Sequence, residues 1–170
     1  YNEMAKQLTL SVKQTQQVDP NNDYPQADFF QTFVDVEIDG RIERVWIKPQ
    51  VENTFTFDVV ARPKIVDFDN EGNLIKELKF EKPVGDLIYQ MLNDKDVLGR
   101  NWAMQQLANR HAAGPESAAV QTALLSALEK DTLSHNRLAA LRALRNIAEP
   151  EPTPNPLKVD AATVRGWDPR

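Results

Sequence analysis

Cysteine is absent from this sequence, and histidine occurs only twice among its 170 residues. Without thiols the chain has no disulfide, no thiolate metal site and no cysteine nucleophile. A zinc site needs three or four converging ligands, and neither His111 nor His135 has an acid or a second histidine at ligand spacing. We therefore predict that this chain carries no catalytic, cofactor-binding or metal-binding residue.

Glycine, positive charge and long apolar runs are also scarce. The six glycines form no phosphate-binding loop, and neither a Gly-x-Ser-x-Gly nor a His-Glu-x-x-His motif occurs. The net charge is −5, with no basic excess of the kind that nucleic-acid binding requires. No apolar run approaches the roughly 20 residues that span a bilayer. From the charge and the lack of a long apolar run, we predict that the chain binds neither nucleic acid nor a membrane. No secretory leader is recognisable, and we predict no compartment.

The first eighty residues alternate apolar and polar side chains, which is the pattern of β-strands. Six short runs carry it, and polar turns rather than helices separate them. This arrangement predicts an antiparallel β-sandwich domain over residues 1–82, with a late turn at 69–72. The runs lie at 8–12, at 30–38, after Gly40, at 55–59, at 64–68 and at 74–80.

A hairpin is predicted at Asp39-Gly40, which lies between two of these runs. Asp-Gly is a strong signal for a two-residue type I′ turn. Such a turn places Asp35 opposite Arg44 and Phe33 opposite Trp46. A charge pair and an aromatic pair in register support this alignment.

At Pro83 the pattern changes to the spacing of amphipathic helices. The predicted helical domain covers residues 83–148, and the prolines at positions 150, 152, 154 and 156 predict an extended spacer over 149–170. The helices are expected at 84–92, 95–111, 115–130 and 134–148.

The helical half repeats a set of residues at an offset of 37 positions. An acid, an arginine, an alanine and a leucine recur in register, which predicts a HEAT-like repeat of stacked helical hairpins. The alternative is a coincidence between two amphipathic helices that use the same residue types. The first set is Asp94, Arg100, Ala103 and Leu107, and the second is Asp131, Arg137, Ala140 and Leu144.

The remaining polar clusters have simple structural interpretations. Asp94 and Asp96 stand at the start of a predicted helix, where acids cap free amides, so capping is favoured over a cation site or a catalytic carboxylate pair. Arg137, Arg142 and Arg145 give the last helix a basic side, which is either a solvated face or an interface for an acidic partner. Two tryptophans are expected to pack within the core or between the domains: Trp46 and Trp102.

The order of these features resembles part of a known family, the zinc aminopeptidases of the alanyl aminopeptidase type. In that family an N-terminal β-domain and a thermolysin-like catalytic domain precede a β-sandwich and a helical C-terminal domain. The family's zinc signature, His-Glu-x-x-His with a later Glu, and its Gly-x-Met-Glu-Asn motif are both absent here. The segments that resemble the junction of the last two parts are 8–16, 29–38, 61–69 and 94–107.

The resemblance implies a non-catalytic accessory region of a zinc aminopeptidase. Its partner would be the catalytic domain of the same polypeptide, which it would brace while limiting access to the cleft, and zinc would be bound only in that missing domain. The aminopeptidase-like subunit of a general transcription factor is nearly as similar. The alternative function is therefore a scaffold without peptidase activity, or a stand-alone module that binds a protein on its helical repeats.

Overall fold

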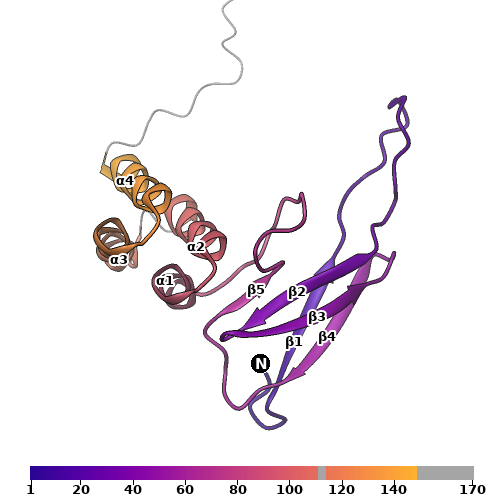
Figure 1. Cartoon of the computed structure of the whole chain (residues 1–170), viewed down its shortest axis with the longest axis horizontal. Helices are drawn as coiled ribbons and strands as arrows, with labels where there is room; N and C mark the ends of the chain where they lie inside the picture. The colour runs from indigo at the N-terminus through magenta and orange to yellow at the C-terminus, as the bar shows by residue number, and fades with distance from the viewer. Residues whose placement is uncertain (111–113, 149–170) are drawn as a thin grey trace, which may run out of the picture.

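A computed structural model describes residues 1–110 and 114–148 of the chain. Within these residues, antiparallel strands in two small sheets come first and four packed helices follow, so the α+β class is confirmed (Figure 1). The predicted extension over 149–170 lies outside the described residues, as does His111. The strands are β1 (Gln7–Lys13), β2 (Thr32–Ile38), β3 (Arg41–Ile47), β4 (Glu52–Asp58) and β5 (Val66–Phe68). The helices are α1 (Val84–Asn93), α2 (Val97–Arg110), α3 (Ser117–Lys130) and α4 (Ser134–Ala148).

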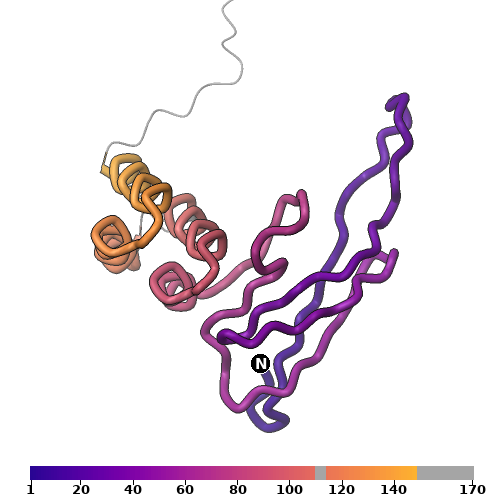
Figure 2. Tube along the Cα trace, viewed as in Figure 1, coloured from indigo at the N-terminus to yellow at the C-terminus, as the bar shows by residue number. Residues whose placement is uncertain are grey.

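The two sheets share one hydrophobic cluster. One sheet pairs β1 with β4, and the other has the order β3-β2-β5. Alternate residues of each strand point inward, so the inner faces supply the apolar side chains and the other faces remain polar or aromatic. Figure 2 shows the helices gathered on one side of the sheets, joined to them by the segment between β5 and α1. The buried members of the cluster are Leu10, Val34, Val36, Ile38, Val45, Ile47, Phe57 and Phe68.

The hairpin predicted at Asp39-Gly40 is confirmed. Asp39 has φ 47° and Gly40 has φ 87°, the left-handed values that a type I′ turn needs at both positions. Asp35 pairs with Arg44 and Phe33 with Trp46, in the predicted register. The Asp39 carboxylate also accepts the backbone N–H of Ile65 at 2.8 Å, which attaches the turn to the chain before β5.

The strand predicted over 74–80 is wrong, because that segment pairs with no other strand. The Asp69 carboxylate accepts the backbone N–H groups of Asn73 and Leu74 and contacts the Lys76 ammonium, which turns the chain away from β5. Leu78 and its apolar neighbours still pack on the sheet cluster. Alternation of side chains suits any extended segment on a hydrophobic core, so the pattern alone did not reveal the missing partner.

The four helices pack around a second cluster of buried side chains. None of the helices in residues 1–110 and 114–148 is both long and apolar enough to cross a membrane. Alanines predominate where α4 approaches α2, which lets their backbones come close. The cluster contains Val84, Leu87, Met91, Ala103, Met104, Leu107, Val120, Ala123, Leu124, Ala127, Ala140 and Ala143.

The residues that recur at the 37-position offset make matching contacts. Asp94 ends α1 at φ −60° and ψ 135°, and Asp131 ends α3 at φ −61° and ψ 133°. Arg100 Nη1 donates to the Asp94 carbonyl at 3.0 Å and to the next carbonyl at 3.3 Å. Arg137 Nη1 donates to the Asp131 carbonyl at 2.7 Å and to the next carbonyl at 3.3 Å. The same local hydrogen bonds therefore occur in both hairpins, α1–α2 and α3–α4.

A polar contact joins the two hairpins beside the alanine seam. Arg100 Nε and Nη2 donate to the two Asp131 carboxylate oxygens at 2.8 and 3.1 Å. Asn136, which is 1% exposed, donates to the Val97 carbonyl at 3.1 Å and accepts from Asn101 at 3.1 Å. Every charge buried at this contact is thus opposed by a partner.

Candidate functional site

Three carboxyl groups are buried together where the sheets meet the helices. Glu37 of β2 and Asp67 of β5 are partners in the register, so both side chains leave the same outer face of the sheet. That face meets the end of α1, where Asp94 is the C-cap residue. The exposed fractions are 4% for Glu37, 5% for Asp67 and 3% for Asp94.

Glu37 and Asp94 form a carboxyl pair that holds a proton. Burial raises the pKa of Glu37 to about 7, and the neighbouring Asp94 charge adds to this effect. Burial also raises the pKa of Asp94, although the backbone N–H of Asp96 and the Gln90 amide donate to its carboxylate and oppose that rise. Since two adjacent carboxylates repel, Glu37 keeps its proton up to about neutral pH, where about half of it is ionised, and in its protonated form it donates to Asp94.

Lys82 supplies the positive charge of the cluster. It lies in the short connection before α1, and its Nζ donates to the Val66 carbonyl at 2.5 Å and to Gln90 Oε1 at 2.6 Å. Burial lowers the pKa of Lys82 to about 8, although Asp67 and Asp94 favour its charged form. Burial likewise raises the pKa of Asp67 to about 6, while the Lys82 charge opposes the rise.

The first turn of α2 packs directly on these carboxylates. A methyl group at Gly99 would overlap the Asp94 carboxylate and lie 2.9 Å from Asp67 Oδ2. Glycine at this position therefore lets α2 approach both acids closely. Gln90 is fully buried between Lys82 and Asp94, which it links by accepting from one and donating to the other.

Further contacts around the cluster tie the two halves together. Arg62, after β4, donates to both carboxylate oxygens of Asp86 in α1, at 3.1 and 2.5 Å. The Phe80 and Trp102 rings lie 6.3 Å apart, and the Lys82 ammonium lies 4.9 Å from the centre of the Trp102 ring. These contacts leave the connection at Lys82 little freedom to act as a hinge.

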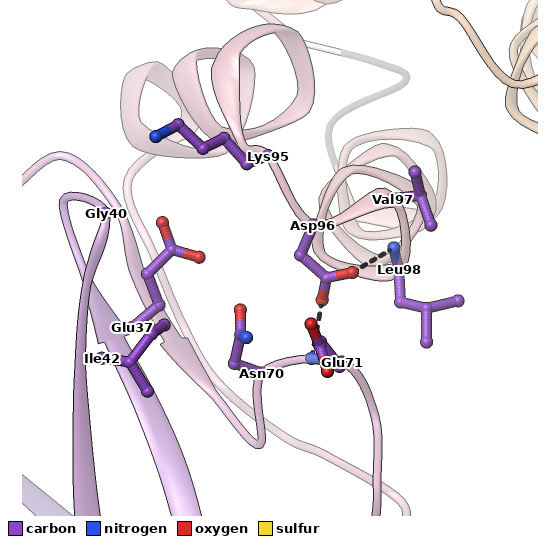
Figure 3. Close-up of a pocket in the computed structure, with 9 residues that line it drawn as sticks. All are labelled: Glu37, Gly40, Ile42, Asn70, Glu71, Lys95, Asp96, Val97 and Leu98. Atoms are coloured by element: carbon purple, nitrogen blue, oxygen red, sulfur yellow. Dashed lines mark hydrogen bonds between the residues drawn. The ribbon is translucent and has the colours of Figure 1, made fainter.

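An open cleft of about 560 Å³ lies beside the cluster. Glu37 and Ile42 line it on the sheet side, and Asp96 and Leu98 line it on the helical side (Figure 3). The Asp96 carboxylate accepts the Leu98 N–H and the N–H of Glu71, so the chain after β5 is attached to the start of α2. The cleft thus has acidic groups on both walls.

An acid with a raised pKa beside a cleft is a candidate for proton transfer. Glu37 meets that description, but it shares its proton with Asp94. The amine of the cluster, Lys82, donates to Val66 and Gln90 and does not line the cleft. Within residues 1–110 and 114–148, no group of three or more His, Cys, Asp or Glu residues is arranged to hold a metal ion. The arrangement is best suited to holding two structural units together.

The structure places the predicted polar residues at several separate points. Asp96 caps α2 as predicted, because its carboxylate accepts N–H groups of the first turn. Asp94 instead ends α1 and joins the buried carboxyl pair. His135 and Arg142 are exposed on α4, whereas Arg137 is half-buried and donates to backbone carbonyls. Arg145, also on α4, is exposed.

The two tryptophans differ in their surroundings. Trp102 packs between the halves, as predicted, against Phe80 and Lys82. Trp46 is 40% exposed on the outer face of β3, where it makes an edge contact with Phe33 at 4.7 Å between ring centres. The rings of Phe33 and Trp46 therefore lie on the surface of the described chain.

Sequence reasoning missed the central residues of the buried cluster: Glu37, Asp67 and Lys82. Each stands in an otherwise ordinary strand or connection. The available signal was positional, because Glu37 and Asp67 alternate with buried apolar residues and so share one face of a sheet. That signal does not say which element covers the face.

No family model and no curated protein matches the chain. Among solved structures, it is similar to Legionella pneumophila aminopeptidase A in a crystal structure with aspartic acid, with a TM-score of 0.57 and 20% sequence identity. The match covers 84% of this chain and 17% of that chain. This level of identity shows a likeness of fold to part of an aminopeptidase, and the chain spans only about a sixth of that protein's length.

Proposed function

We propose that this chain is a non-catalytic accessory region of a zinc aminopeptidase, in which the two sheets and the helices hold a catalytic domain of the same polypeptide in place. The observation that carries the proposal is the fold match to part of an aminopeptidase. The order of features in the sequence, which resembles part of the zinc aminopeptidase family, adds to it. In this proposal zinc binds only to the missing catalytic domain.

A bracing role requires rigidity, and the buried junction supports it. Lys82 bonds to the last strand and to α1 at once, and Arg62 binds Asp86 with two hydrogen bonds. The sheets over 1–82 and the helices over 83–148 would then move as one body. Such a rigid body could keep one wall of a catalytic cleft at a constant distance from the opposite wall and limit access to the cleft.

The exposed aromatic pair offers a surface for the catalytic domain. Phe33 is 61% exposed and Trp46 is 40% exposed, on the face of β2 and β3 that points away from the shared cluster. The bidentate pair of Asp35 and Arg44 lies beside them in the register. Aromatic residues and arginine are enriched at protein interfaces.

We also propose that α1–α2 and α3–α4 are two copies of a HEAT-like repeat. The support is the recurrence of the arginine-to-carbonyl hydrogen bonds at the 37-position offset. A coincidence of residue types would not by itself reproduce the same donor and acceptor atoms. In the accessory role, this short stack would extend the surface beyond the sheets.

The rival function is a protein-interaction module or scaffold without peptidase activity. The open cleft between Glu37 and Leu98 and the exposed helical faces favour binding over chemistry. This alternative does not need a catalytic domain in the same polypeptide.

The coding sequence upstream of Tyr1 separates the two functions. A His-Glu-x-x-His motif followed by a glutamate in the same reading frame would support the accessory role. A reading frame that opens close to Tyr1, without that motif, would contradict it and favour the module.

An activity assay provides an independent check. Purified chain should release no amino acid from chromogenic amino-acyl amides, with or without added zinc, because none of its residues is expected to activate water. Zinc-dependent release that follows the chain through purification, and that an unrelated protein prepared identically lacks, would overturn the non-catalytic assignment.

A further inference from the structure

The first helical hairpin has a face that the second hairpin covers, and the matching face of the second hairpin is open. Asn101 of α2 donates to Asn136 of α4 at 3.1 Å, and Met104, one turn later, is 1% exposed. The residues 37 positions further on are Leu138 and Leu141 of α4, which are 43% and 51% exposed. Two leucines therefore stand uncovered where the first hairpin has buried contacts.

The same difference occurs between α1 and α3. Ile88 of α1 packs against the helical cluster, whereas its counterpart Leu125 of α3 is 49% exposed. The open face thus spans both helices of the second hairpin, as the covered face spans both helices of the first. A third hairpin on this face would repeat the interface that the first two hairpins make with each other.

The contacts of the two arginines indicate which group a third hairpin should supply. Arg100 uses Nη1 for backbone carbonyls and uses Nε and Nη2 for the Asp131 carboxylate of the next hairpin. Arg137 makes the same Nη1 contacts. Among residues 1–110 and 114–148, no carboxylate lies within ion-pair distance of its guanidinium. A carboxylate in a following hairpin would complete the pattern.

Charge also distinguishes the open face from the covered one. Arg142 and Arg145 occupy the positions of Gln105 and Ala108 in the first hairpin. The open face is therefore apolar with a basic border. A second copy of the same face would bring these arginines together, so charge complementarity favours an acidic occupant.

We propose that the face formed by Leu125, Arg137, Leu138, Leu141 and Arg142 docks an acidic amphipathic helical hairpin of a partner protein. An inter-helix carboxylate of that hairpin pairs with Arg137 as Asp131 pairs with Arg100. Its apolar stripe covers the leucines, and further acids face the basic border. This inference rests on the helical contacts and does not depend on the accessory role.

A synthetic hairpin provides a defined probe. The peptide has the sequence of residues 115–148, so it presents the Asp131 carboxylate on the face that contacts the first hairpin. The changes Arg142→Glu and Arg145→Glu lie on its opposite face and keep the peptide from docking further copies of itself. Binding of the labelled peptide to the full chain is followed by fluorescence anisotropy at low and high salt. We expect saturable binding that weakens as salt rises, because salt screens the attraction between Asp131 of the probe and Arg137 of the chain.

Variants of the chain and of the probe locate the contact. Leu141→Glu in the chain should weaken binding by about tenfold or more, because it puts a charge into the apolar contact. Leu98→Glu changes a leucine that is 52% exposed on α2, outside the proposed face, and should leave binding unchanged. Asp131→Asn in the probe should weaken binding about tenfold by removing the carboxylate for Arg137.

The outcomes decide the proposal without relying on one variant. Circular dichroism of the chain with Leu141→Glu checks that the helices persist. Absence of binding to the unmodified chain would overturn the proposal, as would equal binding of the Asp131→Asn probe or equal loss with Leu98→Glu. A chain that sediments as a dimer only while Leu141 is intact would assign the face to a second copy instead, which also contradicts it.

Discussion

Charged side chains are buried at two junctions in this molecule, and they are neutralised in different ways. Between the two hairpins, Arg100 and Asp131 oppose one another with a bidentate hydrogen-bonded pair. Although burial opposes ionisation of Asp131, the hydrogen bonds from Arg100 and the Leu133 N–H hold its pKa below the usual range. Between the sheets and helices, several acids share one lysine, and a proton takes the place of a second cation.

The difference teaches where each junction is sensitive. A matched ion pair needs both partners and is indifferent to pH in the neutral range, because neither group titrates there. A junction with a surplus of acids is satisfied only while one of them keeps its proton. Removing a partner should therefore damage the first junction most, and raising the pH should weaken the second.

The largest expected effect tests whether the two halves unfold together. Leu87 is 2% exposed in the helical core, and Leu87→Asp should lower the free energy of unfolding by several kcal/mol because it buries an unpaired charge. Chains that retain only Trp46 or only Trp102 report the two halves by near-UV circular dichroism. We expect one common transition, shifted for both probes.

The control is Leu92→Asp on the same helix, where the leucine is 40% exposed and the change should be small. Two well-separated transitions, with only that of Trp102 moved by Leu87→Asp, would mean that the sheets and helices are loosely joined. The proposed bracing role would then lose its physical basis.

The next effect concerns the matched junction. Arg100→Met should lower the free energy of unfolding by about 3 kcal/mol, because it leaves the Asp131 carboxylate buried without its cation. Urea denaturation followed by far-UV circular dichroism measures the change. Arg44→Met is the matched control, since it breaks a bidentate pair with Asp35 in which the Arg44 side chain is 68% exposed. That change should be much smaller, because solvent screens the exposed pair, and equal effects would contradict the importance of burial.

The pH dependence of stability tests the acid-rich junction. The pKa of Glu37 is raised from 4.5 to about 7 and that of Asp67 from 3.8 to about 6. The folded state then binds more protons than the unfolded state between these values, so stability should fall as pH rises from about 4.5 to 7. The two shifts together correspond to about 6 kcal/mol, since one pKa unit corresponds to about 1.4 kcal/mol. Solvent screening beside the open cleft should reduce the fall to the order of 3 kcal/mol.

Lys82 reverses the trend at higher pH. Its pKa is lowered from 10.5 to about 8 in the folded state, so the folded state releases its proton first and stability should recover between about 8 and 10.5. Urea midpoints measured across this range give both slopes. Glu37→Gln should flatten the fall in stability below pH 7. A wild-type urea midpoint that rises steadily from pH 5 to 7 is incompatible with a raised pKa of Glu37.

The smallest effect concerns the hairpin turn. Gly40→Val should lower the free energy of unfolding by about 1 kcal/mol or more, because a β-branched residue resists the left-handed φ of 87°. Gly85→Ala is the control: its added methyl group meets no atom within 4 Å and lies in α1, where alanine is the better helix former. Thermal denaturation should show a lower midpoint only for Gly40→Val.

The register of β2 and β3 could be predicted because it depends on local chemistry. A two-residue turn at Asp39-Gly40 leaves one way to align the neighbouring residues, and Asp35 then meets Arg44. The boundaries of α1 and α3 could be predicted to within a few residues for a similar reason, since apolar spacing and end residues are read along the chain. The hydrogen bonds of Arg100 and Arg137 were not predicted, although their recurrence at one offset pointed to a shared role.

The segment 74–80 and the buried cluster mark the limit of such reasoning. Leu74 and Phe80 alternate with exposed residues as they would in a strand, but the segment pairs with none of the strands, although β5 is an edge strand of its sheet. Whether an extended segment finds a partner depends on the arrangement of the other strands, which the segment's own residues do not encode.

The α+β order, the hairpin turn and the offset between the hairpins can be read along the chain, because each follows from contacts between neighbouring residues or from a repeated pattern. The meeting of Glu37, Asp67, Lys82 and Asp94 depends instead on how the packed elements come together. These residues come from two strands, a connection and a helix end, and their pKa values are shifted by loss of water around the whole group. Burial of that kind is a property of the packed faces, and no spacing of residues along the chain expresses it.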